Sequence, residues 1–277
     1  MIPQSNISRL SNRLAKAGGR RIPEAVLERD YCIAWFLVAL GRSSLCKKLA
    51  FKGGTALRRC HFEEYRFSED LDFTLIVPLS FENLQKSLVP VYQEIQHASA
   101  IVFQFSRQDP GHHSNCFTFY LRYDGPLPTV SSGKEVKVDV TIKEEMIFPI
   151  ENRIVLKSYV EYEDLPNDQK IQVYSLQEIA TEKTIALMDR ARNEPRDLYD
   201  LWYLIKNGIS LLDLSDAINK KLKFRGKELA EVKKEFQNKE ARLRKAWATR
   251  LSTHMVSLPQ FDDVFRIVKR EFRQSGF

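Results

Sequence analysis

The segment from residue 51 to residue 73 constrains this chain more than any other part of it. It reads FKGGTALRRCHFEEYRFSEDLDF, so a Gly-Gly-Thr turn precedes two aspartates, Asp70 and Asp72, at the start of an apolar run. Glycines let the backbone approach phosphates closely, and the N–H groups of such a turn attract anions. A turn that wraps phosphates, followed by two carboxylates, is typical of metal-assisted phosphoryl transfer.

Strand periodicity places the two carboxylates together. Because side chains of a strand alternate between its faces, Asp70 and Asp72 share one face, while the opposite face reads as core. Two adjacent negative charges are unfavourable unless a cation lies between them, and Mg²⁺ commonly binds one or two carboxylates plus substrate phosphates. We therefore expect a magnesium site here, with two ions suited to in-line displacement. The alternative is a solvated aspartate pair at a strand end, which an isolated Asp-x-Asp pattern would favour. The two predicted faces consist of Asp70, Asp72, Thr74 and Ile76, and of Leu71, Phe73, Leu75 and Val77.

A third carboxylate comes from the clearest strand pattern in the chain, residues 135–143. Its valines alternate with polar residues, and Asp139 lies on the polar face. If this strand pairs beside the strand of Asp70 and Asp72, Asp139 reaches the metal site, where it would bind an ion or take the proton of an attacking hydroxyl. Spacing alone favours the alternative, an ordinary exposed aspartate.

Composition limits the class of protein. With 277 residues and 43% hydrophobic residues, the chain can build a large core. No segment approaches the ~20 apolar residues of a membrane span, and the N-terminus does not resemble a signal peptide, so we expect a cytoplasmic protein without a membrane partner. The four cysteines are scattered, which indicates reduced thiols rather than structural zinc. We expect His112 and His113 on a loop surface.

Positive charge is concentrated near the C-terminus. Residues 220–250 contain twelve Lys or Arg and four Glu, whereas the whole chain carries a net charge of +7. Such a segment suits a polyanion such as RNA. A solvated helix with internal ion pairs explains the same pattern equally well.

The remaining patterns predict three parts. Residues 1–44 form helices that pack on a core, residues 45–160 form a mixed α/β core, and residues 175–277 are helical. The polar segment from 161 to 170 contains a proline and is the best candidate for a boundary.

The helical half carries two cations on an apolar stripe. A capping box at residues 175–178 starts a helix, and Lys183 and Arg190 fall on its apolar face. An unpaired buried ammonium is unfavourable, so both residues need a carboxylate or a phosphate partner. Asp200 on the following helix is a candidate partner, while Asp197 in its first turn is explained by the helix dipole.

Taken together, these motifs resemble the AbiEii/AbiGii family of nucleotidyltransferase toxins, which includes the MenT proteins and belongs to the DNA polymerase β-like superfamily. The resemblance extends over about 150 residues, from 51 to 204, and Thr55 replaces the usual Ser of the superfamily. The matching pieces are residues 52–58 (KGGTALR), 66–72 (RFSEDLD), 138–140 (VDV), 182–190 and 196–201 (RDLYDL).

The resemblance implies an α+β fold, with a polymerase β-like nucleotidyltransferase core of mixed sheet and flanking helices, followed by a C-terminal helical bundle. It implies that Asp70, Asp72 and Asp139 hold Mg²⁺, that Lys183 contacts the triphosphate, and that Asp200 is a further catalytic residue. The candidate nucleotide-binding residues are Lys52, Gly53, Gly54, Thr55, Arg58, Arg66, Ser68, Lys183 and Arg190.

Family members are similar to one another in acting as toxins of toxin–antitoxin or phage-defence pairs. We therefore expect transfer of a nucleotide from an NTP to RNA, at the 3′ end of tRNA, and a cognate antitoxin partner. One alternative is nucleotide transfer to a protein hydroxyl. Another is a non-catalytic module that binds nucleotide or RNA.

Overall fold

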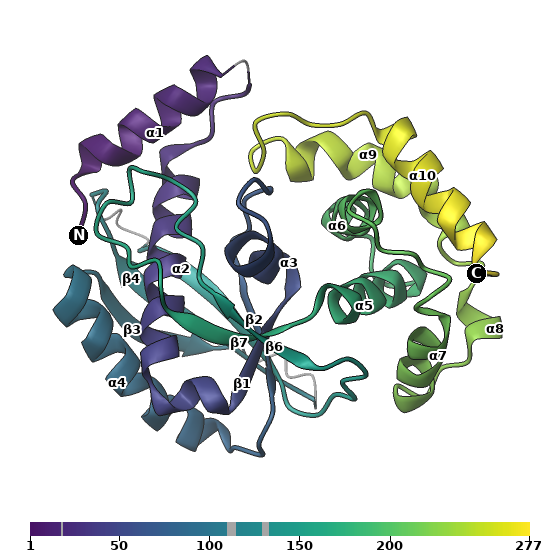
Figure 1. The fold of residues 1–277 in the computed structure, drawn as a ribbon, viewed down its shortest axis with the longest axis horizontal. Helices are drawn as coiled ribbons and strands as arrows, with labels where there is room; N and C mark the ends of the chain where they lie inside the picture. The colour runs from purple at the N-terminus through teal and green to yellow at the C-terminus, as the bar shows by residue number, and fades with distance from the viewer. Residues whose placement is uncertain (18, 110–114, 129–132) are drawn as a thin grey trace. The chain divides into compact units, whose positions relative to one another are not determined.

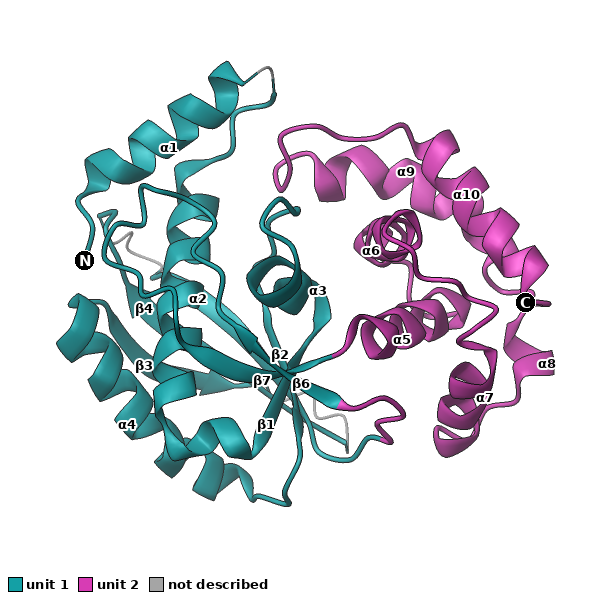
Figure 2. Ribbon diagram, viewed as in Figure 1, with its two compact units in different colours: residues 1–144, 150–174 teal, residues 145–149, 175–277 magenta. Residues whose placement is uncertain are grey.

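The computed structural model describes residues 1–17, 19–109, 115–128 and 133–277, so His112 and His113 lie outside the described residues. Two compact units divide the chain (Figure 2): unit 1 comprises residues 1–144 and 150–174, and unit 2 comprises residues 145–149 and 175–277. Within the described residues, no helix has the length and apolar character required to cross a membrane.

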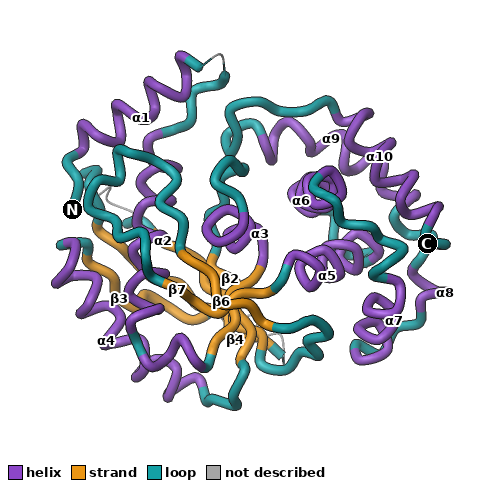
Figure 3. The backbone as a smooth tube through the Cα atoms, in the orientation of Figure 1, coloured by secondary structure: helices purple, strands orange, loops and turns teal. Residues whose placement is uncertain are grey.

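Unit 1 is built on one seven-stranded sheet, whose strand order is β3-β4-β5-β2-β1-β7-β6 (orange in Figure 3). Two of its contacts are parallel, β2 with β5 and β1 with β7, and the others are antiparallel. The sheet is therefore mixed, as expected. The strands are β1 (Leu49–Lys52), β2 (Leu71–Leu75), β3 (Val102–Gln108), β4 (Cys116–Asp124), β5 (Glu135–Thr141), β6 (Ile150–Ile154) and β7 (Lys170–Tyr174).

Three long helices of unit 1 are α1 (Gln4–Lys16), α2 (Glu24–Arg42) and α4 (Phe81–Ser99) (Figure 1). Helix α2 packs against α1, α4 and β7, and its residues from 30 to 40 are all buried. This explains its nearly unbroken apolar sequence, since a helix covered on all sides has no polar face. A short connection follows β1, consisting of α3 (Gly53–Ala56) and the π-helical turn Leu57–His61.

Strands β2 and β5 show the predicted alternation. Leu71, Phe73 and Leu75 are buried, and β5 alternates between half-buried polar residues and buried valines. Val77 departs from the expected core face. Its side chain is 48% exposed because β2 ends at Leu75, so the alternation no longer applies there.

The C-terminal edge of unit 1 differs from the predicted boundary at residue 160. Unit 1 continues to Tyr174 because β7 pairs with both β1 and β6. Tyr162, in the segment expected to be a linker, is fully buried and donates its hydroxyl to the Leu27 carbonyl at 3.0 Å. The polar composition of residues 161–170 therefore does not mark a free connection.

Unit 2 is helical, as predicted. At its start, the Ser175 hydroxyl accepts the Glu178 backbone N–H at 3.2 Å. Glu178 does not complete the reciprocal capping box, because its carboxylate accepts the N–H groups of Ile147 and Phe148 instead. The helices are α5 (Leu176–Met188), α6 (Pro195–Lys206), α7 (Ser215–Phe224), α8 (Leu229–Val232), α9 (Glu240–Leu251) and α10 (Phe261–Gln274), with a 3₁₀ turn at Gln237–Lys239.

His61 makes the stability of unit 1 dependent on pH. Its Nε2 lies 2.9 Å from the Tyr174 carbonyl, which fixes the end of the π-helical turn on β7. Burial, together with the charge of Arg153, lowers the pKa of His61 to about 4. The unfolded chain takes up a proton near pH 6.5 and the folded chain does not, so the free energy of unfolding falls as the pH drops from about 6.5 to about 4.

Urea unfolding at pH 7 and pH 4 should reveal this effect. We expect His61→Gln, whose amide can donate to the same carbonyl without titrating, to lose about 3 kcal/mol less than the wild type between these pH values. All other groups titrate in both proteins, so the difference isolates His61. Equal losses would show that His61 is protonated in the folded protein.

Candidate active site

The glycine turn lies directly against the aspartate strand. Gly53 follows β1 with a φ of +78°, a conformation that favours glycine. A Cβ at this position would overlap the carboxylate of Asp72, and a Cβ at Gly54 would overlap the guanidinium of Arg66. Gly53 is therefore favoured by its backbone conformation as well as by its approach to Asp72, whereas a side chain at Gly54 would displace the end of the Arg66 side chain.

Two hydroxyls join the same turn to the segment that enters β2. The Thr55 Oγ1 lies 2.8 Å from the Ser68 Oγ and 2.5 Å from the carbonyl oxygen of Asp70. Thr55 and Ser68 are both buried. These hydroxyls thus fix the position of Asp70 relative to the turn, and their contact with a nucleotide stays a prediction.

Two of the predicted carboxylates, Asp72 on β2 and Asp139 on β5, lie on neighbouring strands, and Asp70 directly precedes β2. Asp72 is the register partner of Lys52 on β1 and of Asp139 on β5. The condition on which Asp139 was included, pairing of its strand beside that of Asp70 and Asp72, is therefore met. Lys52 reaches across the same face, where its Nζ donates to the Thr141 Oγ1 at 3.0 Å.

Asp139 is held by two side chains of the sheet. Its Oδ1 accepts the Thr118 hydroxyl at 2.6 Å, and its Oδ2 accepts the Lys137 ammonium at 2.7 Å. Among the residues that the structure describes, no three His, Cys, Asp or Glu side chains gather closely enough to hold a metal ion together. Asp139 is thus adjacent to Asp72, but its two carboxylate oxygens bind Thr118 and Lys137.

The electrostatics of this face nevertheless fit a hard divalent cation. Burial lowers the pKa of Lys137, but its hydrogen bond to Asp139 and the charges of Asp139, Asp70 and Asp72 outweigh burial and raise it. The negative charges of all three carboxylates therefore act on the Lys137 ammonium. Carboxylate oxygens are the donors that Mg²⁺ prefers, so the residues present fit this ion.

Arg58 is a correction to the predicted nucleotide-binding set. Its side chain is fully buried, pairs with Asp30 at 2.6 Å and donates to the Tyr65 carbonyl at 2.7 Å. A guanidinium held in this way cannot also reach a triphosphate or an RNA backbone, so Arg58 belongs to the core. Arg66 is also buried, but its guanidinium packs beside Gly54 and it remains a candidate.

Unit 2 holds a second cluster of charges. The Lys183 ammonium bridges Asp197 at 2.7 Å and Asp200 at 2.8 Å, which confirms the expected pairing of Lys183 with Asp200. Arg192 binds the same Asp197 carboxylate, with Nε at 2.5 Å. Burial raises the pKa of Asp197, but the charges of Lys183 and Arg192 outweigh it and hold this pKa below its usual value.

The prediction that Arg190 lies on the apolar face of a helix is wrong. Helix α5 ends at Met188, so Arg190 lies beyond the helix and is exposed. Arg192 and Asp197 were missed as members of this cluster. A signal was present for Asp197, because residues three apart on a helix share a face and Asp200 was already expected to face Lys183.

Part of the basic segment is structural. Lys221 is fully buried and pairs with Glu178 at 2.6 Å and Glu182 at 3.2 Å. Lys239, also buried, donates to the carbonyls of residues 186, 189 and 192, beyond and at the end of α5. The twelve cations of residues 220–250 are therefore not all available to a polyanion. Exposed cations in this segment are Lys220, Lys223, Arg225, Lys234, Arg242, Arg244, Lys245 and Arg250.

Comparison with solved structures identifies the fold. JHP933 from Helicobacter pylori is similar, with a TM-score of 0.53 and 14% identity over 91% of this chain and 92% of that one. MenT4, a nucleotidyltransferase toxin from Mycobacterium tuberculosis, is similar with a TM-score of 0.56 and 16% identity over 98% of this chain and 89% of that one. Among curated proteins, none matches this chain.

Comparison with protein families identifies the lineage. The family described as nucleotidyl transferase AbiEii toxin, type IV toxin–antitoxin system, matches residues 35–267. The matched range includes the glycine turn, all three carboxylates of the sheet and the Lys183 cluster. This chain therefore belongs to the AbiEii family, the nucleotidyltransferase toxins of type IV toxin–antitoxin systems.

Proposed function

We propose that this nucleotidyltransferase transfers a nucleoside monophosphate from an NTP to the 3′ hydroxyl of an RNA, namely a tRNA. The observation that carries the proposal is the register of β2 and β5, which sets Asp72 beside Asp139 and next to a glycine turn in which a Cβ at Gly53 would overlap the Asp72 carboxylate. On such a surface, the phosphates of a nucleotide bound at the turn would lie near the carboxylates.

In the proposed reaction, the hydroxyl oxygen of the acceptor forms a bond to the α-phosphorus, and the bond from that phosphorus to the β-phosphate oxygen breaks. Pyrophosphate leaves, and the hydroxyl proton passes to a base such as Asp139. Mg²⁺ on Asp70 and Asp72 would supply charge stabilisation for the attacking and leaving oxygens.

The proposal assigns a role to the glycine turn and to Lys183. The glycine turn of residues 53–54 offers backbone N–H groups to the phosphates. Lys183, fixed in orientation by Asp197 and Asp200, neutralises charge on the β and γ phosphates.

The exposed cations of residues 220–250 support RNA as the acceptor. They lie on α7, α9 and the segment between them, and side chains of this kind bind a nucleic-acid backbone without reading its sequence. A tRNA end that is single-stranded needs no more than such positioning. The cognate partner of a toxin in this family is an antitoxin.

The test is incubation of the purified protein with each α-labelled NTP, Mg²⁺ and total tRNA, followed by a denaturing gel. We expect label on tRNA, from one preferred NTP. Label on protein in place of RNA would overturn the acceptor and favour transfer to a protein hydroxyl, such as one on the antitoxin. NTP binding without label on either would identify a non-catalytic module.

A further inference from the structure

Lys137 stands out among the side chains of the candidate site because the proposed reaction gives it no task. It lies on β5 two residues before Asp139, on the same polar face, and its ammonium is 2.7 Å from the Asp139 Oδ2. The Thr118 hydroxyl occupies the other oxygen of this carboxylate. Both oxygens of Asp139 are thus engaged within the sheet.

The position of Lys137 relative to β2 extends its influence to the other carboxylates. Asp72 is the register partner of Asp139, and Leu71, the first residue of β2, is that of Val138. The charges of Asp70 and Asp72 both act on its ammonium. Lys137 is therefore one of the cations that act on this face, beside Lys52, the register partner of Asp72, and Arg29, on which the charge of Asp70 acts.

The Lys137 side chain does not pack in the core. Its side chain is 37% exposed and that of Asp139 is 26% exposed. A surface ion pair of this kind contributes little to stability by itself, and the flexible four-carbon stem of a lysine allows its ammonium to leave one partner. Its contribution is consequently electrostatic and reversible.

We propose that Lys137 is the resident counter-ion of Asp139, and that a divalent cation binds to this carboxylate face with full affinity only after displacing the Lys137 ammonium from Asp139. This inference rests on the proposed Mg²⁺-dependent reaction and adds to it. A site occupied by its own cation has a lower apparent affinity for a competing ion, in proportion to the fraction of protein in which the site is open. Free metal is then held weakly until a nucleotide brings further negative charge.

The experiment measures binding of free Mn²⁺ by electron paramagnetic resonance, without nucleotide or RNA. Wild type is compared with Lys137→Met, which keeps the aliphatic side chain and removes the ammonium. We expect Lys137→Met to bind Mn²⁺ about tenfold more tightly, the effect of removing one competing charge at short range in a partly solvated site.

Two further variants separate displacement from general electrostatics. Lys143→Gln removes one positive charge from an exposed position just beyond β5, and Lys137→Arg keeps the charge at the original position. Both should bind Mn²⁺ within about twofold of wild type if a local competitor sets the affinity. An equal gain in Lys143→Gln and Lys137→Met would overturn the proposal in favour of a uniform charge effect.

Thermal unfolding provides a readout independent of binding. In EDTA, Lys137→Met should melt close to wild type because a surface ion pair contributes little to stability, and added Mn²⁺ should raise its melting temperature more than that of wild type. Unchanged or weaker Mn²⁺ affinity in Lys137→Met would overturn the proposal. Neither measurement needs turnover, so a failure of tRNA labelling leaves this result unaffected and bears on the reaction alone.

Discussion

Replacing Asp72 with alanine is expected to lower nucleotide transfer by at least ~10³-fold, an effect equal to about 4 kcal/mol of transition-state stabilisation. Asp72 lies in the middle of the site, paired in register with Lys52 on one side and Asp139 on the other. Its loss would remove an oxygen ligand of the proposed Mg²⁺, the ion that would stabilise the negative charge that develops on the leaving oxygen. The measurement is the initial rate of label transfer under identical NTP and Mg²⁺ concentrations.

The fold should survive this substitution. Asp72 is half-buried on a face that carries three carboxylates, so removing one negative charge relieves repulsion. Circular dichroism should therefore match wild type. The matched control is Glu135→Gln on the polar face of β5, which pairs with Arg107 at 3.0 Å, and its rate should stay within about twofold. An Asp72→Ala protein that keeps most of its activity would remove the metal assignment.

The elements that could be predicted from the sequence are those with one buried face and one polar face. Strands β2 and β5 have a core side and a polar side, so their sequences alternate and the positions of Asp72 and Asp139 follow. Strand β1 escaped prediction because it is short and mostly buried, and such a run carries no alternation. Strand β7 does alternate, with Ile171 and Val173 buried beside Lys170 and Gln172, but it has only five residues and begins inside the segment that was expected to be a boundary. The π-helical turn after the glycines also has no sequence period of its own.

The places of the carboxylates in the sheet were predicted better than the surroundings of the cations. An arginine four residues after Gly54 looks the same in sequence whether it points to solvent or to the core. Arg58 points to the core because its partner, Asp30, lies on α2, 28 residues earlier in the chain. Lys183 was placed correctly because its apolar neighbours on the same stripe required a nearby carboxylate, and Asp200 supplied it.

The second large effect is expected for Asp30→Ala. This substitution should destabilise the fold because Asp30 is the buried partner of Arg58. The Asp30 carboxylate is 2% exposed, binds both Arg58 and Arg59, and accepts the Tyr162 hydroxyl at 3.0 Å. Burial raises its pKa, but the two guanidinium charges outweigh burial and hold it below its usual value. Without Asp30, two fully buried cations lose their counter-charge, so we expect unfolding to become easier by about 3–5 kcal/mol.

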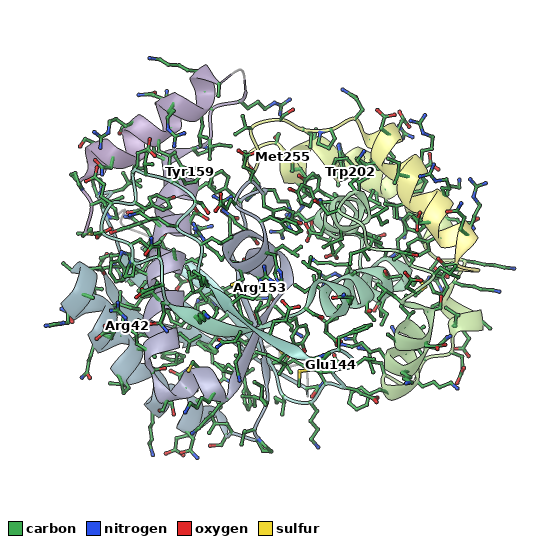
Figure 4. All side chains as sticks on the ribbon, viewed as in Figure 1. Arg42, Glu144, Arg153, Tyr159, Trp202 and Met255 are labelled. Atoms are coloured by element: carbon green, nitrogen blue, oxygen red, sulfur yellow. The ribbon has the colours of Figure 1, made fainter. Side chains whose placement is uncertain are left out.

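Urea unfolding of Asp30→Asn, which keeps the shape of the side chain, provides the same test if the alanine variant does not fold. The matched control is Glu94→Gln. Glu94 pairs with Arg42 (labelled in Figure 4) at 2.7 Å, nearly the same distance as Arg58 to Asp30, but at an exposed position. Its loss should cost about 0–1 kcal/mol. Similar losses in both variants would mean that burial does not decide the value of these pairs, whereas a large difference assigns the stability of unit 1 to the pairing of α2 with the turn that follows the glycines.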